Sequence, residues 1–99
     1  MPAHKVTHYE PGHGPITPWG MADYREVFGP GVSFYGTPTH SGFHVTGQAI
    51  LSIPPRLRRS DYSPYGWFEE DCDWAIVALC FPSLFPQADP SRRKEKSDA

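Results

Sequence analysis

Residues 67–81 read WFEEDCDWAIVALCF, and this stretch decides the fold class that the sequence predicts. The acidic run EED at 69–71 falls in its first turn, where the helix dipole favours negative charge. From Trp74 onward every residue is apolar, so we expect the second half of the segment to be enclosed on all sides. Pro82 disfavours a helical conformation at the preceding residue. The sequence therefore predicts one long C-terminal helix over residues 67–81.

Two short runs earlier in the chain predict the sheet that this helix covers. The runs are VSFY at 32–35 and GFHVT at 42–46, and each is rich in aromatic and β-branched residues. About six turn-forming residues separate them, which is typical of an antiparallel hairpin. Alternation places Phe43 and Val45 on the face toward the helix and His44 on the other face. We expect the core to contain Trp74, Val77, Ala78, Phe81, Phe34, Phe43 and Val45.

The remaining segments predict smaller elements around this unit. Residues 22–28, ADYREVF, have apolar side chains at helical spacing and end at the run GPG, which indicates a short N-terminal helix. Residues 48–53 fit either a turn of helix or a third edge strand. Leu84 and Phe85 are expected to fold back onto the core. The predicted fold class is α+β, with a small antiparallel sheet packed by one long C-terminal helix and one short N-terminal helix.

The two ends of the chain differ from its middle in composition. Residues 1–20 contain four prolines and three glycines and predict an extended arm, because proline removes backbone donors. We expect four apolar side chains to pin this arm to the domain: Val6, Tyr9, Ile16 and Trp19. Residues 87–99 are charged, have no large apolar residue, and predict a disordered tail. A single compact domain is therefore expected over residues 21–86.

Composition excludes several classes of protein. The chain has 99 residues, 38% of them hydrophobic and 14% aromatic, which allows one core and no second domain. A formal charge of −2 is not that of a protein that binds a nucleic-acid backbone, and the cluster Arg56, Arg58 and Arg59 is interpreted as a solvated edge. No apolar run approaches the roughly 18 residues of a membrane span, and no secretory signal is visible. We expect a cytoplasmic protein.

A candidate binding surface lies at the start of the predicted helix. The spacing of Glu69, Glu70 and Asp73 is expected to place three carboxylates on one exposed side of the helix. Trp67 and Phe68 precede them, and aromatic residues beside charged ones are typical of binding surfaces. The simpler interpretation is a solvated acidic turn whose negative charge the helix dipole favours. No catalytic set, metal site or cofactor is predicted.

The alternative is a small metal-dependent or thiol enzyme. Its candidate residues are His8, His13, His40, His44 and Cys72. Against a metal site, two residues four apart in a strand lie about 13 Å from each other, which is too far for one zinc ion. Against a thiol nucleophile, the carboxylates on both sides of Cys72 are expected to raise the thiol pKa.

Four stretches carry a resemblance to a known family. They are PWGMADY at 18–24, YGTPTHSGF at 35–43, IPPRLR at 53–58 and GWFEEDCDW at 66–74. In this order they resemble an uncharacterised family of small domains of unknown function found on bacterial plasmids, integrative elements and phages. The family brings no known activity. The resemblance implies a mobile-element protein that could act on host machinery.

The sequence thus favours a non-enzymatic module for protein–protein interaction. The resemblance makes one version concrete, an inhibitor of a host defence complex of the anti-CRISPR or antirestriction type. Its acidic and aromatic surface would face the basic, nucleic-acid-binding surface of that protein partner. Neither direct binding of nucleic acid nor a membrane contact is expected. A plainer version is an accessory domain that serves only for docking within larger chains.

Overall fold

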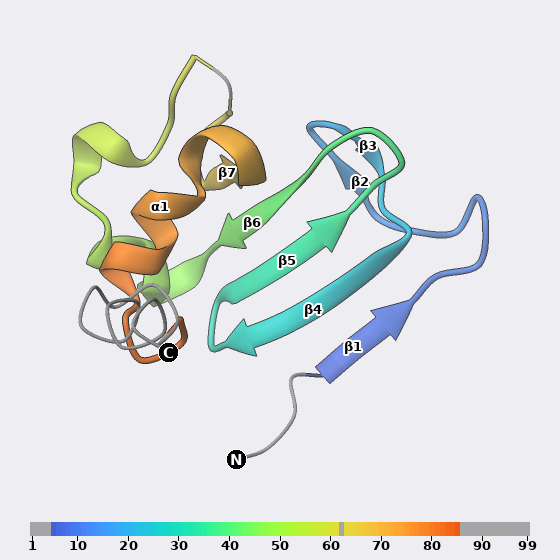
Figure 1. Ribbon diagram of the computed structural model, residues 1–99, viewed down its shortest axis with the longest axis horizontal. Helices are drawn as coiled ribbons and strands as arrows, with labels where there is room; N and C mark the ends of the chain where they lie inside the picture. Colours follow the sequence, from blue (N-terminus) through green and yellow to red (C-terminus); the bar gives the residue numbers. More distant parts are fainter. Residues whose placement is uncertain (1–4, 62, 86–99) are drawn as a thin grey trace, which may run out of the picture.

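A computed structural model describes residues 5–61 and 63–85 of the chain (Figure 1). The described part contains a five-stranded antiparallel sheet in the order β1-β4-β5-β6-β7, a separate two-stranded hairpin and one α-helix. The sheet strands are β1 (Lys5–His8), β4 (Tyr24–Gly29), β5 (Val32–Gly36), β6 (Ser41–Val45) and β7 (Trp67–Glu69). The hairpin pairs β2 (Ile16–Thr17) with β3 (Gly20–Met21), and the helix is α1 (Glu70–Cys80). The predicted α+β class is confirmed.

The predicted hairpin forms the centre of the sheet. β5 and β6 pair in antiparallel register, with Phe34 opposite Phe43 and Val32 opposite Val45. These four side chains are buried on one face and share a core with residues of α1. Figure 1 shows α1 beside β6 and β7, at the end of the sheet away from β1. The expectation that the helix covers the face with Phe43 and Val45 is therefore confirmed.

The predicted short N-terminal helix is wrong, because residues 24–29 form strand β4. This strand pairs with β1 on one side and with β5 on the other. The run YREVF is compatible with both structures. Its apolar residues recur at helical spacing, but it is also rich in the aromatic and β-branched residues that are typical of strands. A helix of two turns gains little on its own, whereas a strand between two neighbours gains a backbone hydrogen-bond ladder on each side. The tertiary context decides in favour of the strand.

The N-terminal arm takes part in the sheet more than its composition suggested. Its proline-free segment Lys5–His8 forms the edge strand β1, and the glycine-rich part that follows carries the β2–β3 hairpin. Val6 and Ile16 are exposed and do not pin the arm, which corrects that part of the prediction. Tyr9 and Trp19 are half-buried.

The C-terminal helix is shorter and less enclosed than predicted. Residues 67–69 pair with β6, so the helix starts at Glu70 and ends at Cys80. Val77 and Ala78 are buried as expected, but Trp74 is 40% exposed and Leu79 is 71% exposed. The prediction that this apolar run is fully enclosed is wrong. The helix lies against one end of a small sheet, so only one side of the helix packs against the sheet. Phe81 is half-buried.

The connections agree with the other predictions. Residues Gly47–Ser52 form a 3-10 helix, the helical alternative for this segment, and a second 3-10 turn covers Pro55–Leu57. Phe85 is buried and packs against the core, as expected for a final anchor. The predicted tail at 87–99 lies outside the described residues. Within residues 5–61 and 63–85, no helix is long and apolar enough to cross a bilayer.

Candidate functional site

The five residues predicted to form one binding surface point to different places. Phe68 is 1% exposed and belongs to the core, while Glu69 and Asp73 are each 7% exposed. Trp67 is half-buried on the opposite face of the sheet, and of these five residues only Glu70 is exposed. The expectation of three exposed carboxylates on one helix side is therefore wrong. Its physical reason is strand β7, which replaces the first turn of the predicted helix.

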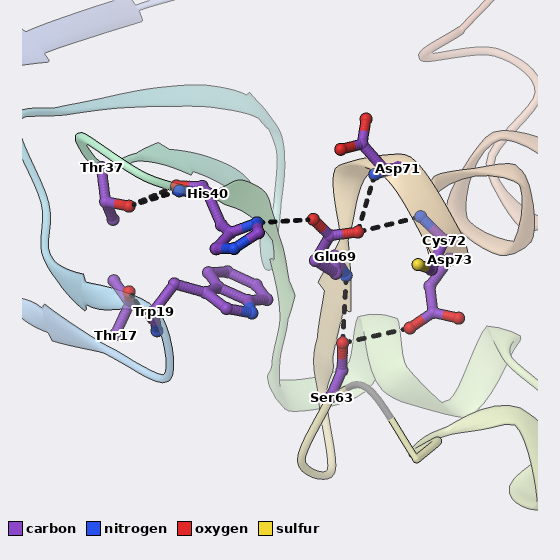
Figure 2. A network of polar contacts seen from close by, with 9 residues as sticks. All are labelled: Thr17, Trp19, Thr37, His40, Ser63, Glu69, Asp71, Cys72 and Asp73. Carbon is purple, nitrogen blue, oxygen red and sulfur yellow. Dashed lines mark hydrogen bonds and ion pairs between the residues drawn. The ribbon is translucent and has the colours of Figure 1, made fainter.

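Glu69 is a buried residue whose side chain stabilises the fold. Its Oε1 accepts hydrogen bonds from the backbone N–H groups of Asp71 and Cys72, at 2.8 and 2.9 Å, so the side chain caps α1. Its Oε2 lies 3.3 Å from Nδ1 of His40. Figure 2 shows this contact as a dashed line between the two side chains. Burial alone raises the pKa of Glu69, but the hydrogen bonds from Cys72, Asp71 and His40 outweigh it and hold the pKa below its usual value.

Asp73 is also an internal residue. Its Oδ2 accepts hydrogen bonds from the hydroxyls of Ser60 and Ser63, at 2.9 and 3.0 Å. The Ser63 hydroxyl in turn accepts the backbone N–H of Glu69 at 3.1 Å, so one serine joins the loop, β7 and α1 (Figure 2). This carboxylate holds Ser60 and Ser63 against the helix, so it does not face a partner.

The residues of the enzyme alternative come together only in part. His40 and Cys72 line a hollow of about 230 Å³ together with Trp19 and Glu69. His44 stacks on Trp67 on the helix-free face of the sheet.

The other two histidines and the thiol give the enzyme alternative little support. His8 contacts Tyr24, and His13 lies in the loop after β1. No three His, Cys, Asp or Glu side chains within residues 5–61 and 63–85 are placed to hold a metal ion. Desolvation, the hydrogen bond to Glu69 and the surrounding carboxylates raise the pKa of Cys72, which disfavours the nucleophilic thiolate.

A larger hollow lies between the inner face of the sheet and the start of α1. Its volume is about 450 Å³, and aromatic rings form its floor while acidic and aromatic side chains of α1 form its rim. The lining residues are Phe28, Phe34, Phe43, Phe85, Glu70, Asp71 and Trp74. We call this feature the aromatic groove.

The floor of the aromatic groove is a packed set of rings. Phe28 and Phe85 stack with centroids 4.9 Å apart, and Phe43 meets both edge-on at 5.6 and 5.3 Å. Trp74 stands at the rim, 6.4 Å from Phe85 between ring centroids, and leaves 40% of its surface to solvent. The groove thus offers apolar contact area that residues 5–61 and 63–85 leave uncovered.

The electrostatics beside the aromatic groove are negative. Glu70 and Asp71 are exposed on its rim. Burial, and then the negative charges of Glu70 and Glu26, raise the pKa of Tyr24 on the adjoining strand. A groove with an apolar floor and an anionic rim suits a ligand that is both cationic and apolar.

Comparison with known proteins places the chain in a family. The model of a domain of unknown function, DUF7007, matches residues 13–98. The chain belongs to this family. No curated protein and no solved structure matches it.

Sequence reasoning missed the aromatic groove for an identifiable reason. Trp74 was assigned to the core, because the run that follows it is apolar throughout. Phe28 was assigned to a helix, so its contact with Phe85 could not be foreseen. The available signal was the juxtaposition of Asp71 and Trp74, which are three residues apart and therefore neighbours on one side of a helix.

Proposed function

We propose that this protein is a non-enzymatic interaction module that binds a basic segment of another protein in the aromatic groove. The observation that carries the proposal is the exposed ring of Trp74 beside Glu70 and Asp71, above a floor of phenylalanine rings. The acidic and aromatic surface expected from the sequence is kept in a revised form. Glu70 remains in it, Asp71 and Trp74 join it, and the buried Phe68, Glu69 and Asp73 leave it, as does Trp67 on the opposite face of the sheet.

The chemistry of the groove supports an occupant with lysine or arginine beside an apolar residue. The stem of such a side chain is apolar and its head is cationic, so the stem can lie on the rings while the head meets the carboxylates. A cation over the exposed face of Trp74 would add a further attraction of about 0.5–2 kcal/mol. Carboxylates at the rim would also speed association with a basic partner and make it sensitive to salt.

The resemblance of the four sequence stretches to domains on mobile elements supports a specific partner class. We propose that the partner is a host defence complex, and that binding covers a basic surface this complex uses for nucleic acid. An inhibitor of the anti-CRISPR or antirestriction type needs no catalytic residues, because occupying such a surface is sufficient. A docking role within a larger assembly would use the same groove.

The experiment compares capture by three forms of the tagged protein from lysate of a bacterial host. The forms are the wild type, the variant Glu70→Lys/Asp71→Lys/Trp74→Ala, and a control with Leu51→Ala, which changes an exposed apolar residue outside the groove. We expect quantitative mass spectrometry to find a protein that the wild type and the control retain and that the groove variant loses. Equal recovery by all three forms, with circular dichroism confirming the fold, would remove the groove from the proposal.

A further inference from the structure

The face of the sheet opposite α1 carries a second surface with a different chemistry. Strand register places Arg25 opposite Tyr35, and His44 opposite Trp67. Because successive side chains alternate between faces, these four residues lie on the side away from the buried Phe34, Phe43 and Phe68. All four are half-buried, so each keeps part of its surface in solvent. We call them, together with Trp19, the outer-face ring cluster.

The rings of this cluster hold one another in place. His44 and Trp67 are stacked, with centroids 3.8 Å apart and planes at 6°. Tyr35 and Trp19 each lie 5.6 Å from the Trp67 ring, the latter edge-on. The Trp19 ring covers Gly42, where a Cβ would meet it at 2.4 Å. The cluster is therefore preorganised, which lowers the cost of ordering it around a ligand.

A cation is fixed beside the rings. The guanidinium of Arg25 lies 5.8 Å from the centre of the Tyr35 ring, and its Nε and Nη2 donate to the Ser33 hydroxyl at 3.3 and 3.2 Å. Burial and the charge of Arg25 lower the pKa of His44, so its ring is neutral at pH 7 and stacks without adding charge.

The strands place two cations on the outer face of the sheet, Lys5 and Arg25, and one carboxylate, Glu69, whose side chain is 9% exposed. Glu10 and Asp23 line a hollow together with Trp19, so carboxylates border the cluster at that end. The exposed carboxylates of Glu70 and Asp71 lie at the aromatic groove on the other side. The net charge of −2, from which the sequence predicted no direct nucleic-acid binding, does not show where Lys5 and Arg25 lie.

We propose that the outer-face ring cluster binds single-stranded nucleic acid. Unpaired bases stack on the solvent-facing parts of the half-buried Tyr35 ring and of the Trp67 ring, one face of which His44 covers, and Arg25 and Lys5 meet the phosphates. Stacking is sequence-tolerant, because every base has a π face. In a duplex the faces of the bases are covered by their neighbours, so the surface selects single strands. With two cations in the strands of this face, the site covers a few nucleotides and its affinity falls as salt rises.

The test measures fluorescence anisotropy of a labelled 12-nucleotide oligothymidine at low salt. We expect saturable binding that an unlabelled single strand competes for and a duplex of equal length does not. Tyr35→Ala is expected to weaken binding at least about fivefold, while Tyr35→Phe stays within about twofold of the wild type. Arg25→Gln provides a second variant and should weaken binding and reduce the salt dependence.

The control is Trp74→Ala, which removes an exposed aromatic ring from the opposite side of the molecule. We expect this variant to bind the oligonucleotide like the wild type, although it disturbs the aromatic groove. The proposal is overturned if the wild type shows no saturable binding, if the duplex competes equally, or if Trp74→Ala weakens binding as much as Tyr35→Ala. A protein partner that is lost on Tyr35→Ala and retained on Trp74→Ala, without oligonucleotide binding, would assign this face to a protein instead.

Discussion

Oε2 of Glu69 lies 3.3 Å from Nδ1 of His40, and this contact joins two residues that are 29 positions apart in the chain. Glu69 is the last residue of β7, directly before α1, and His40 lies in the loop between β5 and β6. The same carboxylate caps the helix through the N–H groups of Asp71 and Cys72. The internal Glu69 thus fixes the helix start and, with it, the position of the exposed Glu70 on the rim of the aromatic groove.

The first prediction concerns Glu69 and acid. Because the fold lowers the pKa of this carboxyl below its ordinary value of 4.5, the unfolded chain binds more protons in that range. The stabilisation is complete above pH 4.5 and is lost as the pH falls through the lowered pKa. Chemical denaturation between pH 6 and 3 should show a smaller loss of stability for Glu69→Gln than for the wild type. Parallel pH curves for the two proteins would contradict this role.

The second prediction separates the buried Asp73 from its exposed neighbour Asp71. Asp73→Ala removes the carboxylate that accepts hydrogen bonds from Ser60 and Ser63 and should cost about 1–3 kcal/mol of unfolding free energy. Asp71→Ala removes an exposed carboxylate and should change stability by about 0.5 kcal/mol or less. Thermal and urea denaturation of the two variants measure the difference. Equal losses would show that Asp73 does not hold the loop.

The third prediction places the greatest packing cost at Phe68. This side chain is 1% exposed, so Phe68→Ala should destabilise the protein by about 3–5 kcal/mol. Phe81 was expected in the core, but it is half-buried, and Phe81→Ala should therefore cost clearly less. Urea denaturation ranks the two. A larger loss for Phe81→Ala would contradict the observed position of the helix end.

The fourth prediction concerns Gly42. A Cβ at this position would lie 2.4 Å from the Trp19 ring and 2.5 Å from the carbonyl oxygen of Phe68. The ring can move but the backbone oxygen cannot do so cheaply, so Gly42→Ala should cost about 1–3 kcal/mol. It should also change the fluorescence of the displaced Trp19. Ser41→Ala in the same strand serves as the control, and a Gly42→Ala protein as stable as that control would argue against the close approach.

The sequence predicted those parts of the fold that depend on local pattern. The hairpin at 32–46 alternates cleanly and was predicted correctly, and the acidic start and apolar body of residues 70–80 predicted a helix there, although not its first residue or its exposure. Residues 22–28 fit two periods at once, and pairing with β1 and β5 decides between them. β5 follows β4 after only two residues, but β1 lies before the intervening residues 9–23, and a local pattern does not contain pairing with so distant a segment.

The candidate site was harder to predict for a related reason. The acidic run at 69–73 looks like one surface only if the helix begins at residue 67. Because residues 67–69 form a strand, the Phe68 side chain lies in the core and the Glu69 side chain caps the helix. Whether a carboxylate is exposed depends on contacts with residues outside the acidic run, such as His40 and Ser63. The spacing of the acidic residues does not predict these contacts.

The central claim is that the aromatic groove binds a basic segment of another protein. Its most direct measurement places the photo-reactive residue benzoyl-phenylalanine at position 74, where it keeps an aromatic ring on the rim, and at position 51 as an exposed control. After irradiation in host lysate, mass spectrometry identifies the cross-linked peptides. The account predicts that position 74 cross-links one lysine- or arginine-rich segment, and that adding Glu70→Lys/Asp71→Lys abolishes it. Cross-links to the same proteins from both positions, or a segment without basic residues, would contradict the account.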